Sequence, residues 1–184
     1  MDRYAHVILV TVLVGIPLGA LVGAFLYRRR VARGWDATWA RRATIAEVGA
    51  VVGTVPWVWM ILTPASGAGG LQTVPFRDLI AVLQGDDSLE QVVGNLLVFA
   101  ALGFFLPIRF RMRGAGPVLV TVALVAAAGS VLVEALQLLL PLGRVASIDD
   151  VLLNTVGAVL GALLSMRWWR ARETPRADAA TGVQ

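Results

Sequence analysis

Long stretches without an ionised side chain are the feature that most restricts what this chain can fold into. Residues 6–27 contain no charged group, and a helix of about 22 residues is about 33 Å long. This length exceeds the ~30 Å hydrocarbon core of a bilayer. Four more apolar stretches follow, at 48–63, 91–108, 114–140 and 151–166. The sequence therefore predicts an all-α membrane protein with a bundle of about five transmembrane helices.

The composition supports this class and excludes others. Of the 184 residues, 58% are hydrophobic and 15% are charged, whereas soluble domains carry about a quarter charged residues. The absence of cysteine excludes disulfides, thiolate nucleophiles and Cys-ligated metals. The single histidine, His6, leaves neither a zinc-binding His pair nor a Ser-His-Asp triad away from the N-terminus. No metal, cofactor or nucleic-acid partner is expected, and no catalytic residue is assigned.

The arginines predict how the bundle is oriented. All 16 basic residues are arginine, and 13 of them follow the first, third or fifth stretch. Only Arg3, Arg77 and Arg144 lie in the other connections. Because cytoplasmic loops of membrane proteins are enriched in basic residues, we expect the N-terminus outside and the C-terminus in the cytoplasm.

The first stretch is also compatible with a cleaved signal peptide, but retention is favoured. A signal peptide carries positive charge before its apolar core, whereas here Asp2 and Arg3 cancel and the arginine triplet 28–30 follows the core. Small residues four apart let helices approach closely in lipid. The glycines expected to pack helices in this way are Gly15, Gly19, Gly23, Gly157 and Gly161.

Polar residues converge near the outer end of the predicted bundle. Glu134 and Gln137 are three apart and therefore share one face of the fourth helix. The third helix, the loop 141–150 and the start of the fifth helix contribute more polar residues at the same depth. The candidate ligand-binding residues are Asn95, Ser130, Glu134, Gln137, Arg144, Asp149, Asp150 and Asn154.

Structural roles compete with ligand binding at several of these positions. Ser147 and Asp150 have the spacing of a capping box at a helix N-terminus. Asn95 and Asn154 are suited to hydrogen bonds between helices.

Acidic residues at membrane depth are costly and usually mark a functional site or a buried partner. For Glu134 the nearest candidate partner is Arg144, just beyond the same helix end. Glu47 follows Arg41 and Arg42 at the cytoplasmic side, where an interfacial ion pair explains it.

The connection at 71–91 has an amphipathic pattern. Its apolar residues surround Arg77 and Asp78 and are followed by the acidic residues Asp86, Asp87 and Glu90. Such a pattern suits a helix in the outer interface, a lid over the bundle, or an ordinary connector. Its acidic end makes the predicted outer face net negative, which would attract a cationic ligand.

Three blocks of the sequence resemble the VanZ-like family of small bacterial membrane proteins. The first two are TVPFRDLI at 73–80 and GNLLVFAALGFFLP at 94–107. Two departures are Ala101 at a common proline position, so that a kink is expected to be missing, and Gly94 at a common acid position. The third block comprises Ser130, Glu134, Gln137, Gly143, Arg144, Asp149, Asp150, Asn154, Gly157 and Gly161.

The resemblance implies a domain organisation and a location. It covers 45–166 as a four-helix membrane domain, preceded by an N-terminal helix and arginine-rich loop at 1–44 and followed by a polar tail at 167–184. It implies a multi-pass protein of the bacterial cytoplasmic membrane. The founding member of the family is associated with low-level resistance to teicoplanin, so the resemblance implies a contribution to glycopeptide resistance.

Three functions are compared. In the first, the outer polar residues bind a lipid, a cell-wall precursor or a lipoglycopeptide, with Arg144 contacting an anionic head group. In the second, the protein is an intramembrane enzyme acting on a lipid-linked substrate, with Glu134 and Asp150 as acid and base, or with Asp149 added as a divalent-ion site. A transporter is disfavoured because the polar residues cluster at one depth and no inverted repeat is evident. The oligomeric state stays open.

Overall fold

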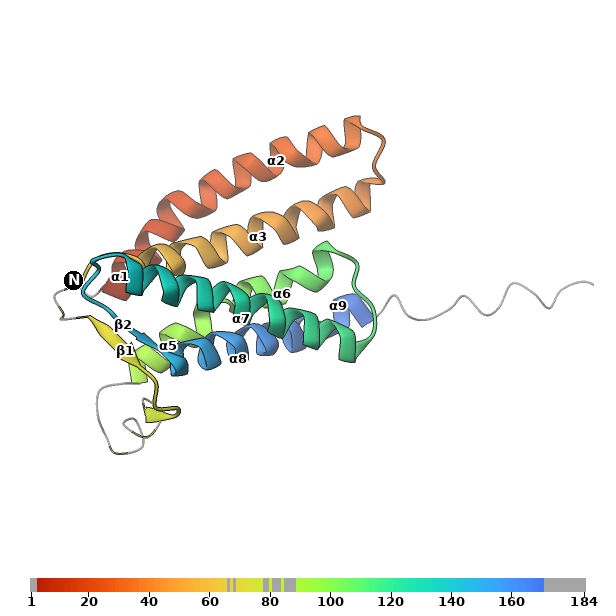
Figure 1. Ribbon diagram of the computed structural model, residues 1–184. Coiled ribbons are helices and arrows are strands. Elements are labelled where there is room, and N and C mark those ends of the chain that lie inside the picture. Colours follow the sequence, from red (N-terminus) through yellow and green to blue (C-terminus); the bar gives the residue numbers. More distant parts are fainter. Residues whose placement is uncertain are drawn as a thin grey trace, which may run out of the picture.

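The computed structural model describes residues 3–65, 67, 69–77, 80, 84 and 89–170. It is a mainly helical bundle with a small parallel sheet at one end (Figure 1). In chain order the elements are α1 (Arg3–Val10), η1 (Thr11–Gly15), α2 (Ile16–Ala32), α3 (Ala37–Ile61), β1 (Gly70–Gln72), α5 (Leu89–Val98), α6 (Ala100–Arg109), α7 (Ala115–Leu139), β2 (Val145–Ser147), α8 (Ile148–Leu164) and α9 (Met166–Arg170).

Helices long and apolar enough to cross a bilayer account for most of the described chain. There are four of them among the described residues, at Ala5–Ala32, Ala37–Ile61, Gln91–Arg109 and Ala115–Leu139. Lipid-facing side chains on them are apolar, as Leu21 at 70% exposure illustrates. The fold is therefore that of a helical membrane protein. The fifth predicted helix exists as α8, which has 17 residues and lies at the short end of the ~17–25 residues that span a bilayer.

Glycines bring α8 into backbone contact with its neighbours. A Cβ added to Gly157 would overlap the carbonyl oxygen of Leu96 in α5. A Cβ added to Gly161 would overlap the carbonyl oxygen of Ala100 in α6. In return, Gly103 of α6 lies directly against the backbone of Ala158. Such close contact gives dispersion and shape complementarity, which replace the hydrophobic effect as the driving force for packing in lipid. As a result α8 lies against α5, α6 and α7 together.

The third predicted helix is interrupted, which corrects the expectation that Ala101 removes its kink. The chain leaves helical geometry at Phe99 (φ −110°, ψ 5°), so that α5 and α6 are separate segments. The buried Phe99 ring packs against Gly129 of α7. A Cβ on Gly129 would lie 3.3 Å from the Phe99 ring. Because α5 and α6 each follow the backbone of α8 closely, packing imposes the break that a proline imposes elsewhere.

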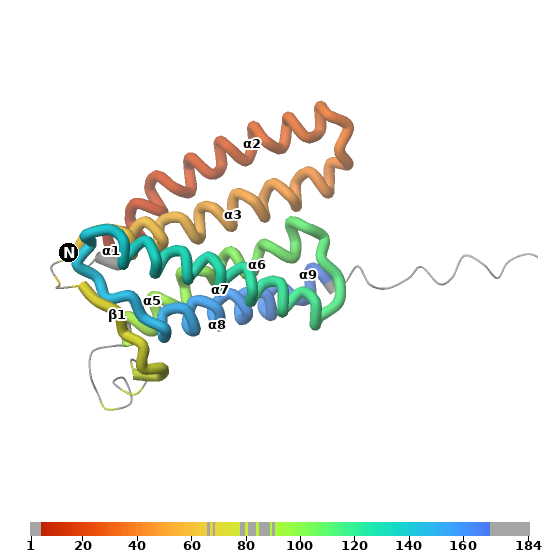
Figure 2. Tube along the Cα trace, in the orientation of Figure 1, coloured from red at the N-terminus to blue at the C-terminus, as the bar shows by residue number. Residues whose placement is uncertain are grey.

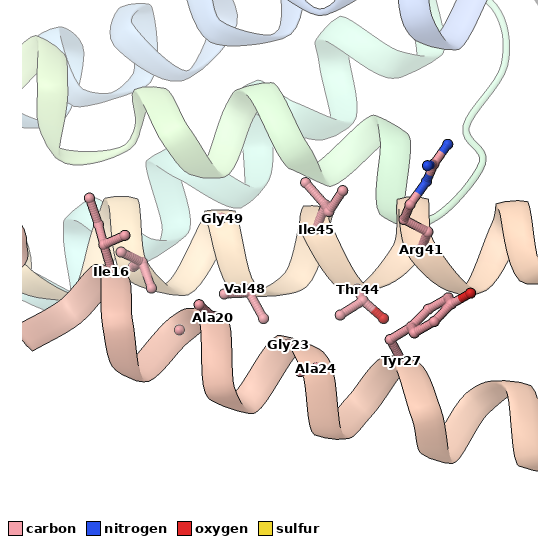
Figure 3. A pocket seen from close by; sticks show the side chains of 12 residues that line it. Ile16, Ala20, Gly23, Ala24, Tyr27, Arg41, Thr44, Ile45, Val48 and Gly49 are labelled. Carbon is pink, nitrogen blue, oxygen red and sulfur yellow. The ribbon is translucent and has the colours of Figure 1, made fainter.

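The α2–α3 hairpin lies along one side of the bundle (Figures 1 and 2). Glycines of α2 face α3: a Cβ on Gly19 would stand 2.9 Å from Val52, and one on Gly23 would stand 3.7 Å from Thr44. An apolar groove of about 490 Å³ runs between the two helices, past Ala20 and Val48 (Figure 3). The glycines of α2 thus allow close contact with α3 alongside this groove.

A carboxylate bridges three helices at the end of the bundle where the α2–α3 and α6–α7 turns lie (Figure 1). Glu47 of α3 forms ion pairs with Arg30 of α2 and with Arg109 of α6. Arg30 also donates a 2.6 Å hydrogen bond to the Thr44 hydroxyl. The expectation of an ion pair for Glu47 is therefore met, but its partners come from other helices and not from the preceding arginines of its own helix.

A two-stranded parallel sheet at the opposite end of the bundle corrects the all-α prediction. β1 pairs with β2 in the register Gly70–Val145, Leu71–Ala146 and Gln72–Ser147. The sheet ties the connection after α3 to the connection before α8. It was not predicted because both strands are three residues long and carry no alternating pattern of their own.

The amphipathic connection predicted at 71–91 lies partly outside the described residues. Residues 78, 79, 81–83 and 85–88 are not described, and neither is the polar tail from 171 onward. Of the rest, Leu71 belongs to β1, and Ile80 donates a helical 2.9 Å hydrogen bond to the carbonyl of Phe76. The lid, the interfacial helix and the simple connector all stay predictions.

We expect Gly157→Ala to lower the free energy of unfolding by about 1–3 kcal/mol, because the added methyl meets the backbone of α5. The measurement is unfolding of the purified protein in detergent, followed by circular dichroism. Gly116→Ala is the matched control, since Gly116 is also helical and a Cβ there meets nothing within 4 Å. Equal stability of the two variants would contradict the packing role of Gly157.

Candidate functional site

A polar cavity opens at the sheet end of the bundle. Its volume is about 430 Å³, within the range of ~300–1,000 Å³ typical of small-molecule sites. Its described lining residues are Met60, Ile61, Gln91, Gly94, Asn95, Glu134, Gln137, Arg144, Val145 and Asp150.

Several elements meet to form this cavity. Helix α3 ends beside it at Ile61, α5 brings Asn95, and α7 brings Glu134 and Gln137 one turn apart. The loop before β2 adds Arg144, and the first turn of α8 adds Asp150. Five of the eight residues predicted from the sequence as ligand-binding candidates therefore line one cavity.

Glu134 is held by backbone and not by an arginine. Its side chain is buried, with 8% of the residue exposed, and its Oε2 accepts a 2.9 Å hydrogen bond from the Ser147 N–H. Ser147 is the residue that caps the N-terminus of α8. The carboxylate of α7 therefore fixes the start of α8. The expected pair with Arg144 is replaced by this contact, since Glu134 forms no ion pair with any described residue.

Arg144 closes the C-terminal end of α3. Its Nε donates to the carbonyl of Thr63 at 2.9 Å, and its Nη2 donates to the carbonyl of Met60 at 3.1 Å. The last carbonyls of a helix have no partner within the helix, and a cation there also interacts favourably with the helix dipole. The guanidinium thus has a structural role in addition to its place in the cavity lining.

Asn95 and Asp150 connect α5 to α8 across the cavity wall. The amide nitrogen of Asn95 donates a hydrogen bond to the Asp150 carboxylate. The expectation that Asn95 bonds across helices is therefore met, and the two residues still line the cavity. The bond fixes the orientation of one of the two carboxylates there.

Gln137 is the least satisfied group of the cavity lining. Its amide nitrogen donates a 3.0 Å hydrogen bond to the carbonyl of Ile61, while its Oε1 is buried and has no hydrogen-bond partner among the described residues. Only 6% of the residue is exposed. A buried polar atom without a partner costs about 1–3 kcal/mol, so an acceptor left open in a cavity lining is suited to a ligand's donor.

Ser130 and Asn154 lie outside the cavity lining, deeper in the bundle. Asn154 of α8 donates a 2.8 Å hydrogen bond to the Ser130 hydroxyl of α7, as expected for a bond between helices. Both residues are almost completely buried. Neither is among the described residues that line the cavity, and their hydrogen bond joins α7 to α8.

Asp149 is also outside the described cavity lining. Its carboxylate accepts a hydrogen bond from the N–H of Phe76, which has a positive φ of 63°. Its own N–H donates to the Ser147 hydroxyl at 3.2 Å, so Ser147 caps α8 as expected, although through Asp149 and not through a reciprocal box with Asp150. Among the described residues, no group of three acidic or histidine side chains could hold a metal ion, which excludes the three-carboxylate site considered from the sequence.

Part of the cavity lining was not predicted from the sequence. Gln91 lies four residues before Asn95, on the same face of α5, and this spacing was the available signal. Met60 and Ile61 contribute at the end of α3, where their carbonyls accept hydrogen bonds from Arg144 and Gln137. The pattern of side chains in the sequence does not predict such backbone acceptors.

The fold and cavity define a small helical membrane protein with a polar cavity at one end of the bundle. Residues 50–170 match the family model described as VanZ/LLP1, and the chain belongs to this family. The match confirms the resemblance seen in the sequence. Comparisons with curated proteins and with solved structures gave no match.

We expect Ser130→Ala and Asn154→Ala to act as one unit. Because the two side chains share one hydrogen bond, a double-mutant cycle should show a coupling of about 0.6 kcal/mol, and at most ~1.7 kcal/mol, in the free energy of unfolding. The measurement is the unfolding of the single and double variants in detergent. Additive effects of the two substitutions would contradict a direct bond between α7 and α8 at this position.

Proposed function

We propose that this VanZ-like membrane protein binds the polar head group of an amphiphile in the cavity and contributes in this way to teicoplanin tolerance. The supporting observation is the lining itself: the carboxylates of Glu134 and Asp150, the guanidinium of Arg144 and the open acceptor of Gln137 share one cavity of ligand size. A cavity serving only to pack helices in lipid would be lined by small and apolar residues.

We place the cavity at the outer leaflet of the bacterial cytoplasmic membrane, with α8 as a fifth span. The arginine-rich α2–α3 and α6–α7 turns lie at the end of the bundle opposite β1 and β2 (Figure 1). The cavity is lined by residues at the β1–β2 end, among them Arg144 and Val145. Basic loops favour the cytoplasmic side, which supports an external N-terminus and a cytoplasmic C-terminus. Arg144 is the only basic residue of the described cavity lining.

Three classes of amphiphile fit this location: a membrane lipid, a lipid-linked cell-wall precursor and a lipoglycopeptide. Teicoplanin carries an acyl chain, so it can reach an outer-leaflet cavity from the membrane surface. An intramembrane enzyme is the second candidate, since Glu134 and Asp150 line one cavity and an acid and a base must both reach the substrate.

The orientation can be tested by cysteine labelling, because the chain has no native cysteine. We expect Val145→Cys, at an exposed site on the cavity end, to react with a membrane-impermeant maleimide in intact cells. Thr38→Cys, exposed near the α2–α3 turn, should react only after permeabilisation. The opposite pattern of labelling would overturn the orientation.

Teicoplanin susceptibility of a sensitive Gram-positive host tests the function. We expect the wild-type protein to raise tolerance, and Glu134→Gln and Gln137→Met at matched membrane levels to return it to the level of the host. These positions are preferred to Arg144, because Arg144 donates to two carbonyls at the end of α3, whereas Gln137 donates to one and Glu134 to none.

Leu138→Met is the matched control for this assay, since Leu138 is adjacent to Gln137 but 49% exposed on the lipid-facing side. It should retain full tolerance. Unchanged tolerance in cells that contain the wild-type protein would contradict the contribution to resistance. Full tolerance in the two cavity variants would contradict the role of the cavity.

A further inference from the structure

We infer that the head group taken by the cavity carries a primary ammonium, received by Gln137, Glu134 and Asp150. This inference rests on the proposed function and gives the ligand a chemical class. It also revises the expectation, drawn from the sequence, that Arg144 selects an anionic head group.

The hydrogen-bonding groups left open in the cavity lining are acceptors. The amide nitrogen of Gln137 is used by the carbonyl of Ile61, so the free group is the oxygen Oε1, an acceptor. The Glu134 carboxylate has one oxygen bonded to Ser147, and its other oxygen has no donor among the described residues. Both positions therefore call for a donor on the ligand.

The charged residues of the cavity lining also bear on the ligand. The described lining includes two carboxylates, Glu134 and Asp150, and one guanidinium, Arg144. The guanidinium is directed at the carbonyls of Thr63 and Met60, where it neutralises the negative end of the α3 dipole. Carboxyl groups outnumber guanidinium groups in the described lining, which favours a cationic head group over an anionic one.

The atoms of the cavity lining also distinguish a primary ammonium from a quaternary ammonium. A primary ammonium has three N–H donors and no acceptor, so it matches a set of carboxylate and amide oxygens. A quaternary ammonium has the same charge without any donor, and it is normally bound by aromatic rings. The described lining contains no aromatic residue, and its open atoms are oxygens. The cavity therefore favours the primary form.

The test uses single-chain amphiphiles that differ only in the head group. The purified full-length protein in phosphatidylcholine nanodiscs is titrated with dodecylammonium, dodecyltrimethylammonium and dodecyl sulfate below their micellar concentrations. Binding is measured by calorimetry, and the signal of empty nanodiscs is subtracted. We expect saturable binding of dodecylammonium only.

Gln137→Met and Glu134→Gln should each weaken the binding of dodecylammonium about tenfold or more, because each removes a hydrogen bond to a charged group. Glu134→Gln retains an oxygen for the Ser147 N–H, so the start of α8 stays capped. Leu138→Met, the same kind of substitution at the adjacent lipid-facing residue, should bind like wild type.

Equal binding of the trimethylated probe, or preferred binding of dodecyl sulfate, would overturn the ammonium assignment while leaving the head-group site in place. Binding of dodecylammonium that does not change in Gln137→Met and Glu134→Gln would also overturn it. These results are independent of the tolerance assay, so failure of this inference is distinguishable from failure of the proposed function.

Discussion

The backbone contact of α8 with α5 and α6 is the interaction on which the rest of the structure depends. Gly157 and Gly161 place α8 against the carbonyls of Leu96 and Ala100, closer than any residue with a side chain allows. This position brings Asp150, at the start of α8, within hydrogen-bond reach of Asn95 on α5. The glycines in the middle of the bundle thus determine the geometry of the cavity at its end.

The polar residues around the cavity provide hydrogen-bond partners for the ends of helices. The terminal N–H and C=O groups of a helix need partners, and few are available in lipid. Arg144 and Gln137 donate to the last carbonyls of α3, and Glu134 accepts from Ser147 at the start of α8. Much of the polar cavity lining therefore has a structural role beside the binding role proposed for it, and mutation of Arg144 would affect the structural role.

The sequence predicted the helices and their faces well, and the contacts between helices poorly. Runs without charge set the helices, and a spacing of three placed Glu134 and Gln137 on one face. The partners of Glu134, the break at Phe99 and the β1–β2 pairing depend on how close the helices lie to one another and on backbone atoms. Residue types along one chain do not encode those distances, so Asp149 was grouped with the site although it binds the backbone of Phe76.

Structural and binding roles can be separated best at Gln137, so substitution of this residue tests ligand binding most directly. Asn95, Glu134 and Arg144 each have a partner that stabilises the bundle, so their loss mixes stability with binding. In Gln137 the two roles are divided between two atoms, because the nitrogen bonds α3 and the oxygen has no partner among the described residues. A buried acceptor without a donor is destabilising by itself, and the ligand proposed above would supply the missing donor.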